Sequence, residues 1–140
     1  MLSFKWTKAH AIYLPEIDAE HRNIFRMAEQ LHKAAARGGD QELLTLVRAV
    51  LTATEVHFNR EERLMRSLMY PLYGWHRQQH ETVRKRGREL LTRIEAGEAG
   101  SVEMFLELLA GWLRDHISLA DRMMGAYVRN YDRLHCAFAS

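Results

Sequence analysis

Four stretches of this sequence place apolar residues every three or four positions, and polar side chains interrupt each repeat at core positions. Such a repeat puts its members on one face of an α-helix. Burying one polar group without a partner costs about 1–3 kcal/mol, whereas a whole domain is stable by only about 5–15 kcal/mol. Six such groups must therefore satisfy one another or share a partner. They are His21, His57, Glu61, His76, His80 and His116.

The apolar repeats predict an all-α fold. The predicted helices span residues 17–37, 41–69, 72–96 and 102–128. Helices of this length with short connections favour antiparallel neighbours. We therefore expect an up-down-up-down four-helix bundle in a single domain over residues 1–140, with an N-terminal arm (1–16) and a C-terminal tail (129–140).

Composition argues against several partners. The net charge is only +2, with 20 Lys and Arg against 18 Asp and Glu, so we expect no nucleic-acid partner. No apolar stretch is long enough to span a bilayer, so we expect no membrane insertion. Cys136 is the one cysteine, which rules out an internal disulfide, and the N-terminus lacks the apolar core of a signal peptide. We expect a cytoplasmic protein.

Two of the polar pairs have the spacing of neighbours on a helix face. His57 and Glu61 are four residues apart, and so are His76 and His80. Residues four apart stack on one face of an α-helix. A buried cation is the simplest shared partner for facing imidazoles and carboxylates.

A third pair, His116 and Asp121, fits helical spacing less well. These residues are five apart, which is about 140° around an axis with 3.6 residues per turn. His21 lies early in the first predicted helix, at the bundle end where His57 and His76 are also expected. The sequence thus predicts seven ligands from all four helices.

Five imidazoles and two carboxylates are more ligands than one ion needs. Without thiolates, the set does not resemble a cysteine-type zinc site, and it suits iron or manganese. Two octahedral ions bridged by both carboxylates and one solvent oxygen would each receive three ligands. Three histidines complete six ligands on one ion, and two histidines give five on the other. The second ion keeps one open position, as a small ligand needs.

The order and spacing of these residues resemble the hemerythrin family, most closely its single-domain bacterial members. The match spans about residues 6–125 and fills all seven ligand positions. Such a pattern across four helices is specific, whereas one pair alone would be weak. The stretches are Ile17-Asp18-Ala19-Glu20-His21, His57-Phe58-Asn59-Arg60-Glu61-Glu62, Tyr70-Pro71, His76-Arg77-Gln78-Gln79-His80 and His116-Ile117-Ser118-Leu119-Ala120-Asp121.

The resemblance implies a non-haem di-iron centre with an oxo or hydroxo bridge that binds dioxygen reversibly at the open iron. His76, His80 and His116 would bind the saturated iron, His21 and His57 the open one, and Glu61 and Asp121 would bridge. It also implies an apolar oxygen pocket that excludes water and proton donors. The pocket residues would be Ile24, Trp112, Leu113 and Ile117, which periodicity alone does not distinguish from plain core.

The function expected from this resemblance is oxygen transport, storage or delivery without catalysis. An oxygen or redox sensor acting through a partner protein is the first alternative. A di-iron oxidase, peroxidase or nitric-oxide-consuming enzyme is the second. Iron storage is disfavoured because the paired, carboxylate-rich pattern of ferritin-like bundles is missing. Glu62 is expected to point off the metal face and is left out of the site.

Overall fold

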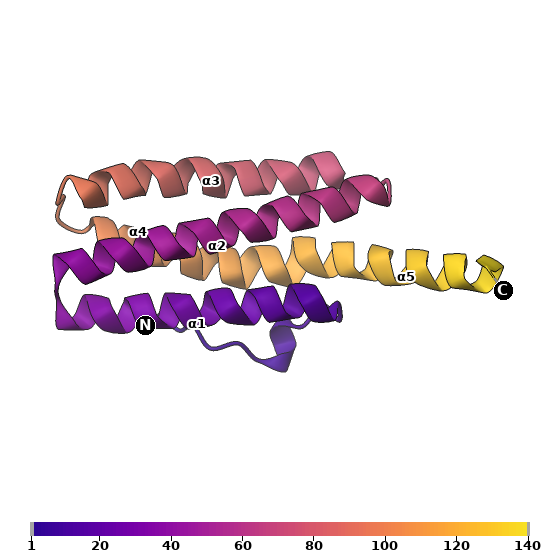
Figure 1. Cartoon of the computed structure of the whole chain (residues 1–140), viewed down its shortest axis with the longest axis horizontal. Coiled ribbons are helices and arrows are strands. Elements are labelled where there is room, and N and C mark those ends of the chain that lie inside the picture. The colour runs from indigo at the N-terminus through magenta and orange to yellow at the C-terminus, as the bar shows by residue number, and fades with distance from the viewer. Residues whose placement is uncertain (1, 140) are drawn as a thin grey trace.

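A computed structural model describes the backbone of residues 2–139 and the side chains of residues 2–135. Figure 1 shows the long helices packed side by side in alternating directions, with a short arm lying along the bundle. The predicted all-α, up-down-up-down bundle is confirmed. The elements are η1 (Lys8–His10), α1 (Pro15–Arg37), α2 (Asp40–Ser67), α3 (Tyr73–Glu95), α4 (Ser101–Gly111), η2 (Trp112–Asp121) and α5 (Arg122–Ala139).

The bundle consists of four long helical segments, here called rods. The first three rods are α1, α2 and α3, and the fourth is built from α4, η2 and α5, which follow one another without a break. Gly111, Trp112 and Arg122, where α4, η2 and α5 meet, all keep right-handed helical backbone angles. η2 is a π-helix between two α-helical segments. The rod therefore changes its helical winding only over the stretch Trp112–Asp121.

Helix α1 begins at Pro15, so the predicted arm (1–16) ends two residues too late. Proline suits the first turn of a helix, because its fixed φ is helical and its missing N–H has no intrahelical partner there. The residues before it are held in place by Asp18 of α1. The Ile12 N–H donates to Asp18 Oδ1 at 2.9 Å, and the Tyr13 N–H donates to Oδ2 at 3.1 Å. The arm is thereby fixed against the start of α1.

Helix α5 reaches Ala139, so the predicted tail (129–140) is wrong as far as residue 139. No glycine or proline follows Gly125, and tertiary contacts hold the segment. Tyr127 Oη donates to the carbonyl of Leu68 at 2.6 Å, and Arg129 donates to the carbonyl of Ile12. In Figure 1 the yellow end of α5 reaches beyond the other helices. The side chain of Cys136 lies outside the described residues.

Among the described residues, most buried side chains are apolar, and most of the buried histidines and carboxylates gather in one cluster. Large side chains such as Phe58, Phe105, Leu31 and Met124 are fully buried. Within residues 2–139, no helix is both long enough and apolar enough to cross a membrane. The buried polar cluster lies in a core that is otherwise mostly apolar.

Candidate metal centre

All seven predicted ligand side chains come together in the core, and each is at most 6% exposed. Their ligand atoms form two overlapping groups, and within each group every atom lies within 4.8 Å of the others. Both groups contain the same two carboxylates. The first group is Glu61, His76, His80, His116 and Asp121, and the second is His21, His57, Glu61 and Asp121.

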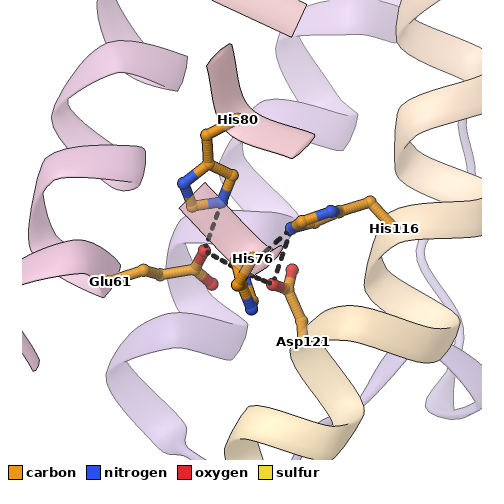
Figure 2. A group of neighbouring side chains, drawn as sticks. All are labelled: Glu61, His76, His80, His116 and Asp121. Atoms are coloured by element: carbon orange, nitrogen blue, oxygen red, sulfur yellow. Dashed lines mark hydrogen bonds and ion pairs between the residues drawn. The ribbon is translucent and has the colours of Figure 1, made fainter. Parts of the chain in front are cut away.

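Each rod of the bundle supplies part of the cluster. His21 comes from α1, a histidine and a glutamate four residues apart come from α2, and two histidines four apart come from α3. Figure 2 shows the larger group, in which Glu61 enters from the left, His80 from above, and His116 and Asp121 from the right. The α-helical spacing explains how α2 and α3 aim both members of each pair inward.

The pair His116 and Asp121 lies on the π-helix η2. A π-helix hydrogen-bonds residue i to residue i+5 and so brings residues five apart onto one face. Nε2 of His116 lies 3.0 Å from Oδ1 of Asp121. The five-residue spacing, which fits an α-helix poorly, therefore suits the winding of this segment.

Glu61 presents its two carboxylate oxygens to two different sets of histidines. Oε1 lies 3.1 Å from Nε2 of His80 and 3.4 Å from Nε2 of His76. Oε2 lies 3.3 Å from Nε2 of His57 and 3.8 Å from Nε2 of His21. The carboxylate thus spans the two groups.

Asp121 spans the same two groups from the opposite side of the cluster. Oδ1 lies 3.0 Å from Nε2 of both His76 and His116. Oδ2 lies 3.1 Å from Nε2 of His21. Two carboxylates that each divide their oxygens in this way have the arrangement of bridging ligands.

The donor atoms fit a pair of cations. Both oxygens of Glu61 and of Asp121 are buried and have no well-aligned hydrogen-bond donor among the described residues. Nε2 of His21 and His57 are 3.0 Å apart, and those of His76 and His116 are 3.1 Å apart. Two ligands at right angles, each about 2.1 Å from one ion, lie about 3.0 Å apart. The atoms therefore have the spacing of ligands that share an ion.

Without a metal, two imidazoles of the cluster, those of His57 and His76, hold a proton at neutral pH. Burial lowers the pKa of His57, but the charge of Glu61 and a hydrogen bond to Glu20 outweigh it and raise the pKa to about 10. Burial also lowers the pKa of His76, and contact with Asp121 and Glu61 raises it to about 9. The site thus attracts positive charge.

Glu61 and Asp121 stay ionised because neighbouring imidazoles stabilise their negative charge. Burial and the charge of Asp121 raise the pKa of Glu61, but His57 outweighs them and holds it well below the usual range. Burial raises the pKa of Asp121, and the neighbouring imidazole of His116 again brings it well below the usual range. Two buried carboxylates that remain charged require a positive partner.

Three further side chains contact the cluster from outside, and the sequence did not reveal them. Nδ1 of His57 lies 2.8 Å from Glu20 Oε1, and Nδ1 of His80 lies 2.8 Å from Glu62 Oε2. Glu62 lies off the metal face, as expected, and is not in either ligand group, but it contacts the outer ring nitrogen of a ligand. It is buried, because the α2 face beside Glu61 packs on α3. Gln79 is the third such residue, with Oε1 2.9 Å from Nδ1 of His116.

The four residues predicted to form an oxygen pocket are all buried: Ile24, Trp112, Leu113 and Ile117. The Trp112 ring lies 6.1 Å from the His57 ring and 6.2 Å from the His116 ring, between centroids. It also packs edge-on against Phe58, which in turn stacks on His80 with ring centroids 3.9 Å apart. Apolar aromatic surface therefore covers one side of the cluster.

One buried hydroxyl belongs to the surroundings of the cluster. Burial and the charge of Asp121 raise the pKa of Tyr70. Its Oη has no hydrogen-bond partner among the side chains and backbone that the structure describes. The sequence pattern points to Tyr70 only as part of the Tyr70-Pro71 stretch, and not as a polar group beside the ligands.

Comparisons with known proteins give a consistent result. Residues 14–128 match the family model of the hemerythrin HHE cation binding domain. A bacteriohemerythrin of Stenotrophomonas maltophilia is 31% identical over 134 residues, covering 93% of this chain and 87% of that protein. One from Methylococcus capsulatus is 29% identical over 108 residues, covering 77% and 82%. The crystal structure of a mutant hemerythrin superposes with a TM-score of 0.85 at 26% identity, covering 91% of this chain and 98% of that one.

Proposed function

Because the chain belongs to the hemerythrin family, we propose that its buried cluster holds two iron ions and binds dioxygen reversibly. Glu61 and Asp121 would bridge the ions. One ion would take His76, His80 and His116, and the other would take His21 and His57.

The observation that supports this proposal best is the unequal division of histidines between two groups that share both carboxylates. An octahedral ion takes six ligands. The two carboxylates and one bridging solvent oxygen supply three to each ion, so three histidines complete one ion and two leave the other a ligand short. Bound iron would supply the electrons and the open position that reversible oxygen binding requires.

The residues around the cluster would protect the oxygenated protein. Ile24, Trp112, Leu113 and Ile117 carry no ionisable group and are buried. Their bulk would exclude water and proton donors from the open position. Since protons promote the loss of reduced oxygen as peroxide, a dry pocket favours release of dioxygen itself.

The physiological role that fits this chemistry is oxygen transport, storage or delivery, without catalysis. We expect a cytoplasmic location, as composition suggested. The protein partner of a carrier would be one that accepts oxygen, and that of a sensor would be a signalling protein.

Metal analysis combined with optical spectra through one oxygenation cycle tests the proposal. The expected result is two irons per chain and a colour change that reverses when oxygen is removed. His57→Ala should lose iron and the colour change. His135→Ala is the matched control, because His135 is exposed and lies outside the cluster. One zinc per chain, or oxygen uptake that cannot be reversed, contradicts the proposal.

A di-iron enzyme is the competing function, and the buried hydroxyl of Tyr70 is the observation that favours it. A phenol near the cluster could deliver a proton to reduced oxygen. Sustained turnover of peroxide or nitric oxide, abolished in Glu61→Ala and slowed in Tyr70→Phe, would replace the carrier function with an enzymatic one.

A further inference from the structure

The three outer partners of the cluster follow a regular order around the bundle. Each is the sequence neighbour of one ligand, yet each contacts a histidine on the next helix. Glu20 of α1 contacts His57 of α2. Glu62 of α2 contacts His80 of α3. Gln79 of α3 contacts His116 of η2. Helices α1, α2 and α3 thus each orient an imidazole on the helix that follows in the bundle.

The chemistry of these contacts decides which ring nitrogen is free. An ionised carboxylate only accepts hydrogen bonds, so Nδ1 of His57 must donate to Glu20, and Nδ1 of His80 must donate to Glu62. Nε2 of each ring is then the atom left to bind a metal. In both rings Nε2 faces Glu61, at 3.3 Å from His57 and 3.1 Å from His80.

Each outer carboxylate is itself held by an arginine. Nε of Arg60 lies 2.6 Å from Oε2 of Glu20. Nη1 of Arg84 lies 2.8 Å from Oε2 of Glu62, and Arg84 also covers the Phe58 ring that stacks on His80. These contacts fix the position of both carboxylates and the plane of the His80 ring.

The third partner differs in charge. Gln79 accepts from Nδ1 of His116 through a neutral amide, at nearly the same distance as the two glutamates. An anionic acceptor pulls the Nδ1 proton more strongly than an amide does and makes Nε2 a stronger donor to a metal. His57 and His80 belong to different groups of the cluster, so each group contains one histidine with a carboxylate behind it.

We propose that Glu20 and Glu62 are positioning residues that strengthen one imidazole ligand on each ion and so stabilise the oxidised state of the pair, whereas Gln79 orients His116 without this effect. The proposal rests on the proposed function for the identity of the metal. The geometric part of the proposal, that Glu20 and Glu62 hold the imidazoles of His57 and His80 in place for a metal, applies to any divalent cation that these histidines bind.

Binding of Zn²⁺ tests the geometric part without using iron or oxygen. Glu20→Ala and Glu62→Ala should each weaken Zn²⁺ binding about 10- to 100-fold in chelator competition. Glu16→Ala and Glu55→Ala are the matched controls, since Glu16 contacts Arg60 and Glu55 contacts Arg84 but neither contacts an imidazole. In nitrogen-15 spectra of the Zn²⁺-loaded protein, His57 and His80 should carry the proton on Nδ1. Affinities equal to those of the controls overturn the proposal.

The electronic part is tested by the midpoint potential of the iron-loaded protein. Glu20→Gln and Glu62→Gln keep the shape and an acceptor oxygen but remove the charge, so the potential should rise. Gln79→Glu adds the charge behind His116, so the potential should fall. Unchanged potentials in all three variants, with helical content and iron content intact, refute the electronic role.

The outcomes also separate this proposal from the proposed function. If the Zn²⁺ affinities divide as expected but the iron protein does not release oxygen, the carrier function fails and the positioning role of the two glutamates stands. If oxygen binds reversibly but the glutamate variants match their controls, the positioning role fails alone. A wild-type protein that binds neither Zn²⁺ nor iron overturns both.

Discussion

Asp121 Oδ1 lies 3.0 Å from Nε2 of His116, although the two residues stand five apart and would diverge by about 140° on an α-helix. The π-helix η2 makes this contact possible. Asp121 also contacts His76 and His21, so it joins three of the four rods at one carboxylate.

Asp121→Asn should therefore prevent loading of the proposed metal pair. The amide keeps the shape but offers only one oxygen and no charge, so it cannot bridge. We expect fewer than two metal ions per chain by elemental analysis. Asp115→Asn on the same π-helix is the control, because Asp115 is exposed and pairs with Arg114. A variant that retained two ions at wild-type affinity would exclude a bridging role.

The contact between His116 and Asp121 could not be predicted from the sequence with the same ease as the other two pairs. The pairs His57/Glu61 and His76/His80 could be predicted because α-helical geometry alone places residues four apart on one face. The contact between His116 and Asp121 depends on a π-helical segment. No residue within 112–121 demands such winding, since α-helical and π-helical segments use the same residue types.

The side-chain partners across helices could not be predicted from the local sequence pattern either. Glu20, Glu62 and Gln79 each serve a histidine on another helix, so their role depends on how the rods are rotated against one another. The helical state of residues 129–139 likewise depends on contacts to Ile12 and Leu68, far away in the sequence. Periodicity predicts which residues face the core but does not predict their partners.

Metal affinity should rise steeply with pH. In the metal-free protein the pKa of His57 is raised to about 10 and that of His76 to about 9, so both carry a proton at neutral pH. A metal must displace these protons, and each proton released adds up to about tenfold in affinity per pH unit. Competition titrations with Zn²⁺ at pH 6, 7 and 8 should show this rise, together with proton release. An affinity independent of pH contradicts the assignment.

The free energy of unfolding of the metal-free protein should fall at high pH, whereas its metal affinity rises. The pKa of His57 is raised above the ordinary value of 6.5, so its stabilising contribution is complete below 6.5 and is lost as the pH rises through about 10. The pKa values of Glu61 and Asp121 are lowered, so their contribution is present above the ordinary values of 4.5 and 3.8 and is lost on acidification. Urea unfolding with a chelator should show weaker stability at pH 10 than at pH 6.5. Bound metal should reduce this alkaline loss, because it replaces the protons.

Gly125→Ala should destabilise the protein by about 1–3 kcal/mol through overpacking. A Cβ at this position would lie 2.7 Å from the carbonyl oxygen of Ile12, which is backbone and cannot rotate away. Gly111→Ala is the matched control within the same rod, because a Cβ there meets no described atom within 4 Å. Alanine should stabilise that helical position by about 0.5–1 kcal/mol. Urea unfolding of the two variants measures both effects, and equal behaviour would mean that the arm does not pack against α5.

If the protein binds dioxygen as proposed, Trp112→Phe should shorten the lifetime of the oxygenated form. A surface groove of about 480 Å³ runs over Trp112 and His116 and is partly lined by Gln79 and Leu119. Trp112 is only 5% exposed, and the centroid of its ring lies 6.1 Å from that of His57. The smaller ring would leave space for water beside the cluster, and water supplies the protons that favour irreversible oxidation.

The control for this variant lies in the same groove. Leu119 is 56% exposed, so Leu119→Ala changes the groove without opening the core and should alter stability by no more than about 0.5 kcal/mol. Trp112→Phe should cost about 1–3 kcal/mol. Decay of the oxygenated spectrum should be faster in Trp112→Phe and unchanged in Leu119→Ala. If both variants decayed like the wild type, Trp112 would be a packing residue only, and the exclusion of water would have to come from Ile24, Leu113 and Ile117.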